Sequence, residues 1–386
     1  IQRLLIARSA SMPKLSVLEN TFVLDLITDG PVVRGAIAWA PRQGFFSVWA
    51  GATILCTGGV GQIFRETTNP AVASGDGLAM AYRAGARLRG MEFVQFHPTV
   101  LYVAGMSRFL VSETARGEGG VLRDRNGLRF MPEYHPDAEL APRDVVSRAI
   151  VRQLAKVHDT HVYLDMTHLP ADRIRRRFPV IYQACLDFGI DMTKDQIPVH
   201  PACHYMVGGV LTDDLGRTTL ENLYACGETA STGLHGANRM GSNSLLEGAV
   251  MGQRAGEHAA AVARRADMRA DGFTPGSRSY AGDLDLQDLD NAVRALMWRL
   301  VGIERDGPGL DAACARLQTW NHLVSQRVFG DPQGWVLVNK LLVGWLIARS
   351  ASRRLETRGT HYRRDYDALD DQHWRRDLEV SRPDRA

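Results

Sequence analysis

The sequence lacks the features that would indicate a membrane span, a zinc site or a disulfide framework. No apolar run reaches the roughly 20 residues that a membrane-spanning helix requires. The five cysteines are scattered without CxxC spacing, at Cys56, Cys185, Cys203, Cys226 and Cys314. Such scattered cysteines favour a reducing compartment. We therefore expect a cytoplasmic protein with no metal site and no membrane partner.

A strong excess of charge of either sign is also absent. The 386 residues include 46 basic and 43 acidic side chains, which gives a formal net charge of +3. This balance produces no global field that would attract nucleic acid, so any cationic site must be local. With 45% hydrophobic and 23% charged residues, the chain has the composition of a globular protein long enough for two or three cores.

One stretch combines polar side chains with glycines in the manner of a ligand site. In LHGANRMGSNSLLE, residues 234–247, the side chains of His235, Asn238 and Arg239 can reach past glycines that let the backbone approach a ligand. Ser and Asn at 242–244 predict the N-cap of a helix over 244–264. The free N–H groups of a helix N-terminus suit an anionic cofactor edge. Taken alone, the stretch is also explained by an ordinary capped helix after a turn.

Two short apolar runs end in glycine turns, as strands do in dinucleotide-binding folds. Residues 52–56 precede Gly58 and Gly59, and residues 223–226 precede Gly227 and Glu228. An acidic residue after such a turn is suited to hold a ribose hydroxyl, although a strand followed by glycines is not specific by itself. The β-rich runs at 21–28, 32–40 and 45–50 predict an antiparallel meander before them. Residues 87–96 are expected to be irregular.

The composition divides the chain into three parts. Between residues 93 and 206, prolines, glycines and charges are frequent, and two helices are expected at 143–157 and 171–188. This segment has the character of a domain inserted into an α/β domain made of residues 1–92 and 207–280. Apolar residues at i, i+3 and i+4 then predict helices at 285–301, 309–328 and 335–358, in a C-terminal helical domain of residues 281–386.

The inserted segment holds most of the candidate chemistry. His97 lies in QFHPT, Glu113 and Arg116 lie in SETARGEGG, Arg143 lies in APRD, and His204 lies in PACHY. No two of these residues form a motif by spacing. A His beside Pro is more often structural than catalytic, and Arg143 is also explained as a surface residue in a first helical turn.

The order of several motifs gives a more specific indication. TGG at 57–59, SGDG at 74–77, QFHPT at 95–99, ARGEGG at 115–120, APRD at 141–144, HY at 204–205, GE at 227–228 and HGANRMGSNSLLE at 235–247 follow one another along the chain. In this order they resemble the flavoprotein family of fumarate reductases and succinate dehydrogenases. The resemblance implies an α/β fold in which a Rossmann-like FAD-binding domain carries an inserted α+β capping domain and is followed by a helical bundle.

The resemblance also implies roles for individual residues. Arg143 would transfer a proton near the reacting carbon, with Glu113 and Arg116 as a relay to solvent. One substrate carboxylate would be held by Arg239 and His204, and the other by His97 and Ser112. Non-covalently bound FAD would be contacted by a set of residues spread over the α/β domain, namely Gly58, Gly59, Asp76, Glu228, Ser244 and Leu245.

Within that family, four segments resemble the L-aspartate oxidases. They are LDMTHL at 164–169, RFPVIYQACLDFGID at 177–191, IPVHPACHY at 197–205 and STGLHGANRM at 231–240. The resemblance implies oxidation of L-aspartate to iminoaspartate, with oxygen or fumarate as acceptor, in NAD biosynthesis with quinolinate synthase as a partner. Two alternatives stay open: a fumarate reductase or succinate dehydrogenase flavoprotein subunit, and a truncated remnant without catalysis.

The sequence departs from the family pattern at its start. No GxGxxG fingerprint for the flavin pyrophosphate is present, and the first residue is not Met. We therefore expect that an N-terminal segment is missing, together with the acidic residue that meets the substrate amino group in aspartate oxidases. Two smaller departures are Ser112, where the family usually has Thr, and Gly241, where aspartate oxidases usually have Ala.

Overall fold

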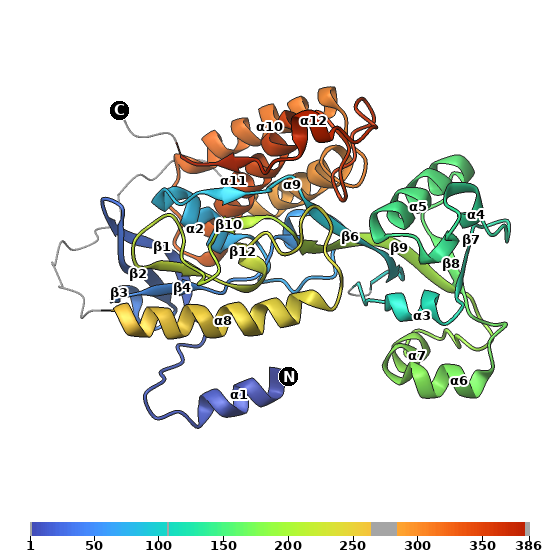
Figure 1. Cartoon of the computed structure of the whole chain (residues 1–386), viewed down its shortest axis with the longest axis horizontal. Helices are drawn as coiled ribbons and strands as arrows, with labels where there is room; N and C mark the ends of the chain where they lie inside the picture. The colour runs from blue at the N-terminus through green and yellow to red at the C-terminus, as the bar shows by residue number, and fades with distance from the viewer. Residues whose placement is uncertain (1, 106–107, 264–283, 383–386) are drawn as a thin grey trace.

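The chain folds into a larger body and a smaller one that are joined by two long strands (Figure 1). The structure, a computed structural model, describes residues 2–105, 108–263 and 284–382. Within these ranges, no helix is both long and apolar enough to cross a membrane. The predicted domain boundary at residues 280 and 281 lies outside the described residues.

Small sheets form the centre of the larger body. The predicted meander is confirmed as β1 (Phe22–Asp29), β2 (Val32–Ala40) and β3 (Gly44–Trp49). The two runs that end in glycine turns form a parallel pair, β4 (Thr53–Leu55) and β11 (Leu223–Ala225). A third sheet has the order β12-β10-β5-β13, from Ala230–Ser231, Gly209–Leu211, Leu88–Arg89 and Glu379–Val380.

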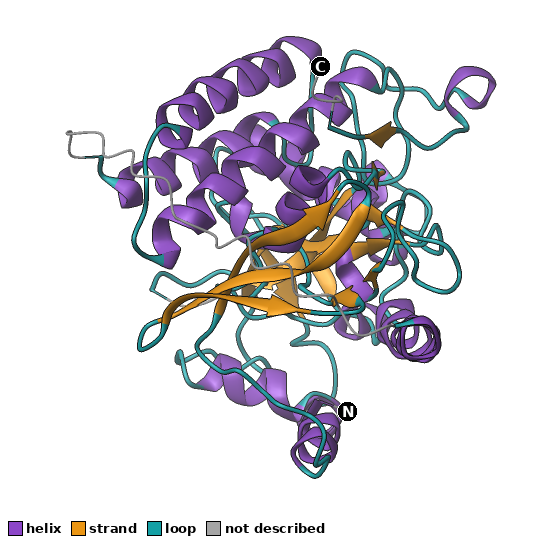
Figure 2. Cartoon of the chain, turned by 90° about the vertical axis from the view of Figure 1, so that its left-hand side faces the viewer, coloured by secondary structure: helices purple, strands orange, loops and turns teal. Residues whose placement is uncertain are grey.

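Helices cover these sheets on both sides (Figures 1 and 2). The helices of the larger body are α1 (Gln2–Ala10), η1 (Gly61–Ile63), α2 (Asp76–Ala84), η3 (Gly227–Thr229), α8 (Asn243–Val262), α9 (Leu286–Leu300), α10 (Gly307–Ser325), α11 (Pro332–Arg353) and α12 (Asp371–Trp374). The three predicted C-terminal helices are thus present as α9, α10 and α11. They share one hydrophobic cluster with the sheets, in which Leu341 and Val293 belong to the same core as Leu55 and Leu78.

The smaller body has a sheet and a core of its own. Its antiparallel sheet has the order β6-β9-β8-β7, from Val94–Leu101, Ile197–Met206, Val162–Asp165 and Val121–Arg123. Around it lie α3 (Glu113–Gly117), α4 (Met131–Tyr134), η2 (Ala138–Leu140), α5 (Arg143–Val157), α6 (Ala171–Arg177) and α7 (Pro179–Leu186). A separate hydrophobic cluster runs from Leu101 to Val199. We call this body the capping domain.

Two predictions about this region are wrong. The expected helix at 171–188 is divided into α6 and α7, because Phe178 leaves the helical conformation with φ −127° and ψ 47° before Pro179. The segment 87–96, expected to be irregular, instead contains β5 and the start of β6. Strands β6 and β9 then carry the chain between the two bodies, which places their side chains at the junction (Figure 1).

Candidate active site

Strands β6 and β9 bring two candidate histidines together at the junction of the two bodies. His97 on β6 pairs with Ala202 on β9, and the ring centroids of His97 and His204 are 5.4 Å apart. The side chain of Gln95 lies on the same side of β6 as His97, because alternate residues of a strand face the same way. This face of the junction forms the floor of the candidate site.

Two arginines from different bodies converge on Gln95. Arg143 begins α5 in the capping domain, and Arg239 lies in the loop before α8. The Oε1 atom of Gln95 accepts hydrogen bonds from Nη1 of Arg143 at 3.1 Å and from Nη1 of Arg239 at 3.3 Å. The guanidinium of Arg239 also lies 4.1 Å from the ring centroid of Tyr205. The site therefore concentrates two positive charges beside two histidines.

A carboxylate connects Arg143 to a second, buried arginine. Glu113 Oε2 accepts from Arg143 Nε at 2.8 Å, and Glu113 Oε1 lies 3.7 Å from Arg116 Nη2. The side chain of Glu113 is 47% exposed, whereas that of Arg116 is 1% exposed. Burial lowers the pKa of Arg116 to about 10, partly offset by the charge of Glu113. Glu113 thus lies between the two arginines and is the member of the expected relay that reaches solvent, whereas Arg116 is its buried end.

Burial, together with the positive surroundings, keeps both histidines neutral near pH 7. Burial lowers the pKa of His204 to about 3, and Arg239 and Arg143 add to this effect. Burial also holds the pKa of His97 well below its ordinary value, and the charges of His204 and Arg143 lower it further. Nε2 of His97 is buried and has no hydrogen-bond partner among the described residues. An anionic ligand would supply both the missing partner and the missing negative charge.

Ser112, the remaining substrate candidate, caps the helix that carries Glu113. Its hydroxyl oxygen accepts from the backbone N–H of Thr114 at 3.3 Å, and the hydroxyl donates to Thr114 Oγ1 at 3.1 Å. Its expected part in holding a carboxylate therefore stays a prediction.

The two glycine turns after β4 and β11 meet as a compact cradle. Gly58 has φ +73°, a conformation that favours glycine. A Cβ atom at Gly59 would lie 2.1 Å from Oε1 of Glu228, so only glycine fits there without moving Glu228. The same oxygen accepts from the backbone N–H of Met206 at 2.9 Å. Burial raises the pKa of Glu228 to about 7, so near neutral pH this carboxyl is partly protonated and can either accept a hydrogen bond from a hydroxyl or donate one.

The N-terminus of α8 faces this region with no side-chain cap. The predicted capping by residues 242–244 is wrong: Ser242 makes no cap hydrogen bond, and the Ser244 hydroxyl oxygen accepts from Arg239 Nε at 3.2 Å instead. Helix N–H groups without a capping side chain suit an electron-rich group. Leu245 is 67% exposed beside them. Together with the glycine cradle, this combination fits a flat flavin with polar edges.

Asp76, another expected flavin contact, is committed to partners within the protein. Its Oδ1 accepts from Asn339 Nδ2 at 2.6 Å, and its Oδ2 accepts from the Ser74 hydroxyl at 2.5 Å. These bonds fix the start of α2 against α11. A flavin contact for Asp76 therefore stays a prediction, as do those of Gly58, Gly59, Glu228, Ser244 and Leu245.

Sequence reasoning missed two residues that shape the site: Gln95 joins the two arginines, and Tyr205 supports Arg239. Asn238, which the sequence did single out, accepts from Gln95 Nε2 at 2.8 Å and donates to Asp144 of α5 at 2.9 Å. Gln95 lies two positions before His97 in QFHPT, so a strand assignment for that motif would have placed both side chains on one face. Asn238 thereby ties the loop of Arg239 to the capping domain.

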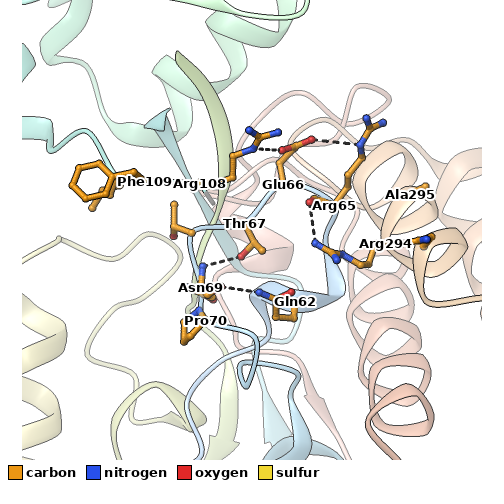
Figure 3. Close-up of a pocket in the computed structure, with 13 residues that line it drawn as sticks. Gln62, Arg65, Glu66, Thr67, Asn69, Pro70, Arg108, Phe109, Arg294 and Ala295 are labelled. Carbon is orange, nitrogen blue, oxygen red and sulfur yellow. Dashed lines mark hydrogen bonds and ion pairs between the residues drawn. The ribbon is translucent and has the colours of Figure 1, made fainter. Parts of the chain in front are cut away.

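The cleft in Figure 3 lies outside this cluster but adjoins one of its histidines. It has a volume of about 950 Å³, and its lining includes Arg65, Arg108, Arg294 and Glu66. None of the predicted site residues lines it. The lining loop reaches the site through Thr68, whose hydroxyl oxygen lies 2.8 Å from Nδ1 of His204. The cleft therefore borders Thr68, the residue that contacts His204, and lies outside the cluster of candidate catalytic residues.

Two family models match the chain, one over its N-terminal part and one over its C-terminal part. A model described as "FAD binding domain" matches residues 1–245, and one described as "Fumarate reductase flavoprotein C-term" matches residues 290–384. An L-aspartate oxidase of Nostoc sp. is 43% identical over 86% of this chain and 62% of its own length. One from Streptomyces coelicolor is 41% identical over 96% of this chain and 68% of its own length. The chain thus spans about two thirds of these relatives.

Solved structures agree with this result. A variant of the E. coli quinol fumarate reductase superimposes with a TM-score of 0.87 and 31% identity, over 99% of this chain and 72% of that one. Sdh1 of Mycobacterium smegmatis superimposes with a TM-score of 0.74 and 34% identity, over 91% of this chain and 62% of that one. The expected fold class and the FAD cofactor are thereby confirmed. This chain belongs to the FAD-dependent oxidoreductase family of the fumarate reductase and succinate dehydrogenase flavoproteins, which includes the L-aspartate oxidases it resembles.

Proposed function

We propose that the complete protein oxidises L-aspartate to iminoaspartate with non-covalently bound FAD and passes the electrons to oxygen or fumarate. The observation that carries the proposal is the convergence of Arg143 and Arg239 on one oxygen of Gln95, next to His97 and His204. A dicarboxylate has the charge to neutralise such a cluster. The aspartate oxidase names of its relatives support the choice of substrate.

The two ends of the site hold the two carboxylates of the substrate. Arg239 offers a planar fork of donors for one carboxylate, with His204 beside it. His97 offers its unpartnered Nε2 to the other, with Ser112 as an additional donor. Binding through two charged ends fixes the carbon chain between them, and this fixed position is what brings a single C–H bond into a reactive orientation.

Residues of the capping domain handle the proton. FAD, when bound, supplies the two-electron acceptor for the oxidation. The Arg143 guanidinium lies against Glu113 at 2.8 Å, so a proton given up by Arg143 toward fumarate can be replaced from the carboxylate side. Glu113 is partly exposed and therefore reaches solvent, while the buried Arg116 lies 3.7 Å from its carboxylate and adds a second positive charge. Arg143 also stabilises negative charge that develops on the substrate.

A fumarate reductase or succinate dehydrogenase flavoprotein subunit is the second candidate. It is favoured by the structural match to the E. coli quinol fumarate reductase. The same positive cluster would hold succinate or fumarate, so the cluster alone does not separate the two substrates. The amino group of aspartate is the feature that distinguishes them.

We place the proposed reaction in the cytoplasm, beside quinolinate synthase. All five cysteines are free thiols, as is usual in a reducing compartment. An imine product hydrolyses readily in water, so an enzyme that consumes iminoaspartate would act close to its source.

The test is a substrate comparison with the FAD-loaded complete protein. Aspartate should be oxidised with release of peroxide in air, and fumarate should be reduced when a reduced donor is supplied. Rapid oxidation of succinate with no turnover of aspartate would overturn the proposal in favour of the second candidate.

A further inference from the structure

Two cysteines lie side by side at the ends of the parallel strand pair. Cys56 follows β4 and Cys226 follows β11, and their Sγ atoms are 3.3 Å apart. The backbone N–H of Cys226 donates to the carbonyl oxygen of Leu55 at 3.1 Å, which continues the strand pairing up to the two cysteines. The register of the two paired strands thus places the two thiols next to each other.

The two thiols are chemically unequal. Cys56 is exposed, whereas Cys226 is 7% exposed. The hydrogen bond from Cys226 lowers the pKa of Cys56 to about 7, and the same bond together with burial raises the pKa of Cys226. A substantial fraction of Cys56 is therefore thiolate at neutral pH, with a protonated thiol in contact. An accessible thiolate beside a second thiol is the arrangement found in peroxide-sensitive cysteine pairs.

We propose that Cys56 and Cys226 form a redox-modification site at which hydrogen peroxide converts the two thiols to a disulfide. The Cys56 thiolate attacks one peroxide oxygen, the O–O bond breaks, and the departing hydroxide takes up a proton to form water. Cys226 then attacks the sulfur of the resulting sulfenic acid. The S–O bond breaks, and a second water leaves with the Cys226 proton. Two thiols lose two electrons, and one peroxide gains them.

The strand geometry permits this bond. Neighbouring strands lie about 4.8 Å apart. Disulfide-bonded cysteines have Cα atoms about 4.4–6.8 Å apart, so the two strands are close enough for the bond, and the two sulfurs must approach to about 2.05 Å. The remaining cysteines differ in their surroundings: burial raises the pKa of Cys185 and of Cys314 to about 11, and that of Cys203 well above its usual value.

The position of the pair gives the modification a consequence. Cys56 lies two residues before Gly58, and Cys226 lies two residues before Glu228. Pulling the sulfurs together displaces the turns that form the glycine cradle, where Gly59 and Glu228 leave no spare room. We expect the disulfide form to hold FAD more weakly. Aspartate oxidation in air would generate peroxide beside this pair, and that link alone rests on the proposed function.

The test begins with added peroxide and the FAD-loaded complete protein. Mass spectrometry without reductant should find a peptide pair joined through Cys56 and Cys226, reversed by dithiothreitol. The pair should react at least ~10-fold faster than Cys314, whose thiol lacks a low pKa. Flavin fluorescence should rise as FAD is released, and fall again after reduction with FAD present.

Three variants separate the roles of the thiols. Cys226→Ser should stop at a sulfenic acid on Cys56 that dimedone traps, Cys56→Ser should leave Cys226 unreacted, and Cys314→Ser should behave as the parent does. Conversion of Cys56 to a sulfinic acid in the parent without any disulfide would overturn the proposal, as would an equal rate at Cys314. If added peroxide forms the disulfide but aspartate turnover does not, the modification site stands and the proposed peroxide-releasing function fails.

Discussion

Gln95 and Arg239 are joined in both directions. Gln95 Nε2 donates to the backbone carbonyl of Arg239 at 2.7 Å, and Arg239 Nη1 donates to Gln95 Oε1 at 3.3 Å. The amide therefore fixes both the loop and the guanidinium of Arg239. Because Oε1 also accepts from Arg143, the relative position of the two arginines depends on this one side chain.

Replacing Gln95 by Leu should disable the site without unfolding it. Leu fills similar space but removes the acceptor shared by two cations, which are then free to move apart. A misplacement of about 1 Å costs on the order of 10²-fold in rate, so kcat/KM for aspartate should fall by about that factor. The measurement is steady-state kinetics together with bound-flavin absorbance.

Gln183→Leu is the matched control, since that amide lies on the exposed face of α7 and bonds to Asp187. It should leave kcat/KM unchanged. Full activity of Gln95→Leu would show that the arginines are positioned by other contacts.

The two arginines should differ in their kinetic effects. Arg143 lies on the capping domain against Glu113, whereas Arg239 lies on the loop before α8 against Ser244. We expect Arg143→Lys to lower kcat by at least ~10²-fold and Arg239→Lys mainly to raise KM, because a point charge replaces a bidentate fork. If both variants change kcat and KM alike, the division of labour between chemistry and binding is wrong.

The sequence predicted the residues of the site better than it predicted the secondary structure around them. The family resemblance implied one site for His97, Arg143, His204 and Arg239, and the structure brings them together at the junction. The sequence could not reveal that Arg143 and Arg239 share Gln95 as an acceptor, because Gln95 and Arg239 are 144 positions apart. Such a contact depends on the closure of two bodies and not on local spacing.

The burial of β6 explains why the sequence did not predict a strand at residues 94–96. All eight of its residues are buried, so the alternation that identifies a half-exposed strand is absent. It also contains Pro98, which argues against a strand. The structure accommodates this proline at an irregularity in the register between His97 and Val100. The predicted cap of α8 failed for a related reason, since Arg239 occupies the Ser244 hydroxyl oxygen only in the folded protein.

Neutralising Glu113 should slow proton transfer and leave binding intact. Glu113→Gln keeps the size of the side chain but removes the charge between Arg143 and Arg116. We expect kcat for fumarate reduction to fall by ~10-fold or more, with an enlarged solvent deuterium isotope effect and an unchanged KM.

Glu118→Gln provides the comparison, because Glu118 ends the same helix but pairs with Arg173 and Arg177. It should keep its kcat. An unchanged isotope effect in Glu113→Gln would remove Glu113 from the proton path.

Glu228 should make the flavin-free protein less stable as pH rises. Its pKa is raised from 4.5 to about 7 by burial, so between these values the folded state keeps a proton that the unfolded state has lost. The free energy of unfolding therefore falls as pH rises through this window and is lowest above pH 7.

Gln does not titrate, so Glu228→Gln should be more stable than the parent at pH 8, by up to ~3 kcal/mol, and not at pH 4.5. The same variant should bind FAD more weakly, because an amide is a poorer acceptor than a carboxylate. Thermal unfolding at the two pH values and flavin titration measure both effects, with the exposed Glu257→Gln on α8 as control. A Glu228→Gln protein that is less stable than the parent at pH 8 would show that the carboxylate is stabilised by its surroundings in the folded state, contrary to the burial that raises its pKa.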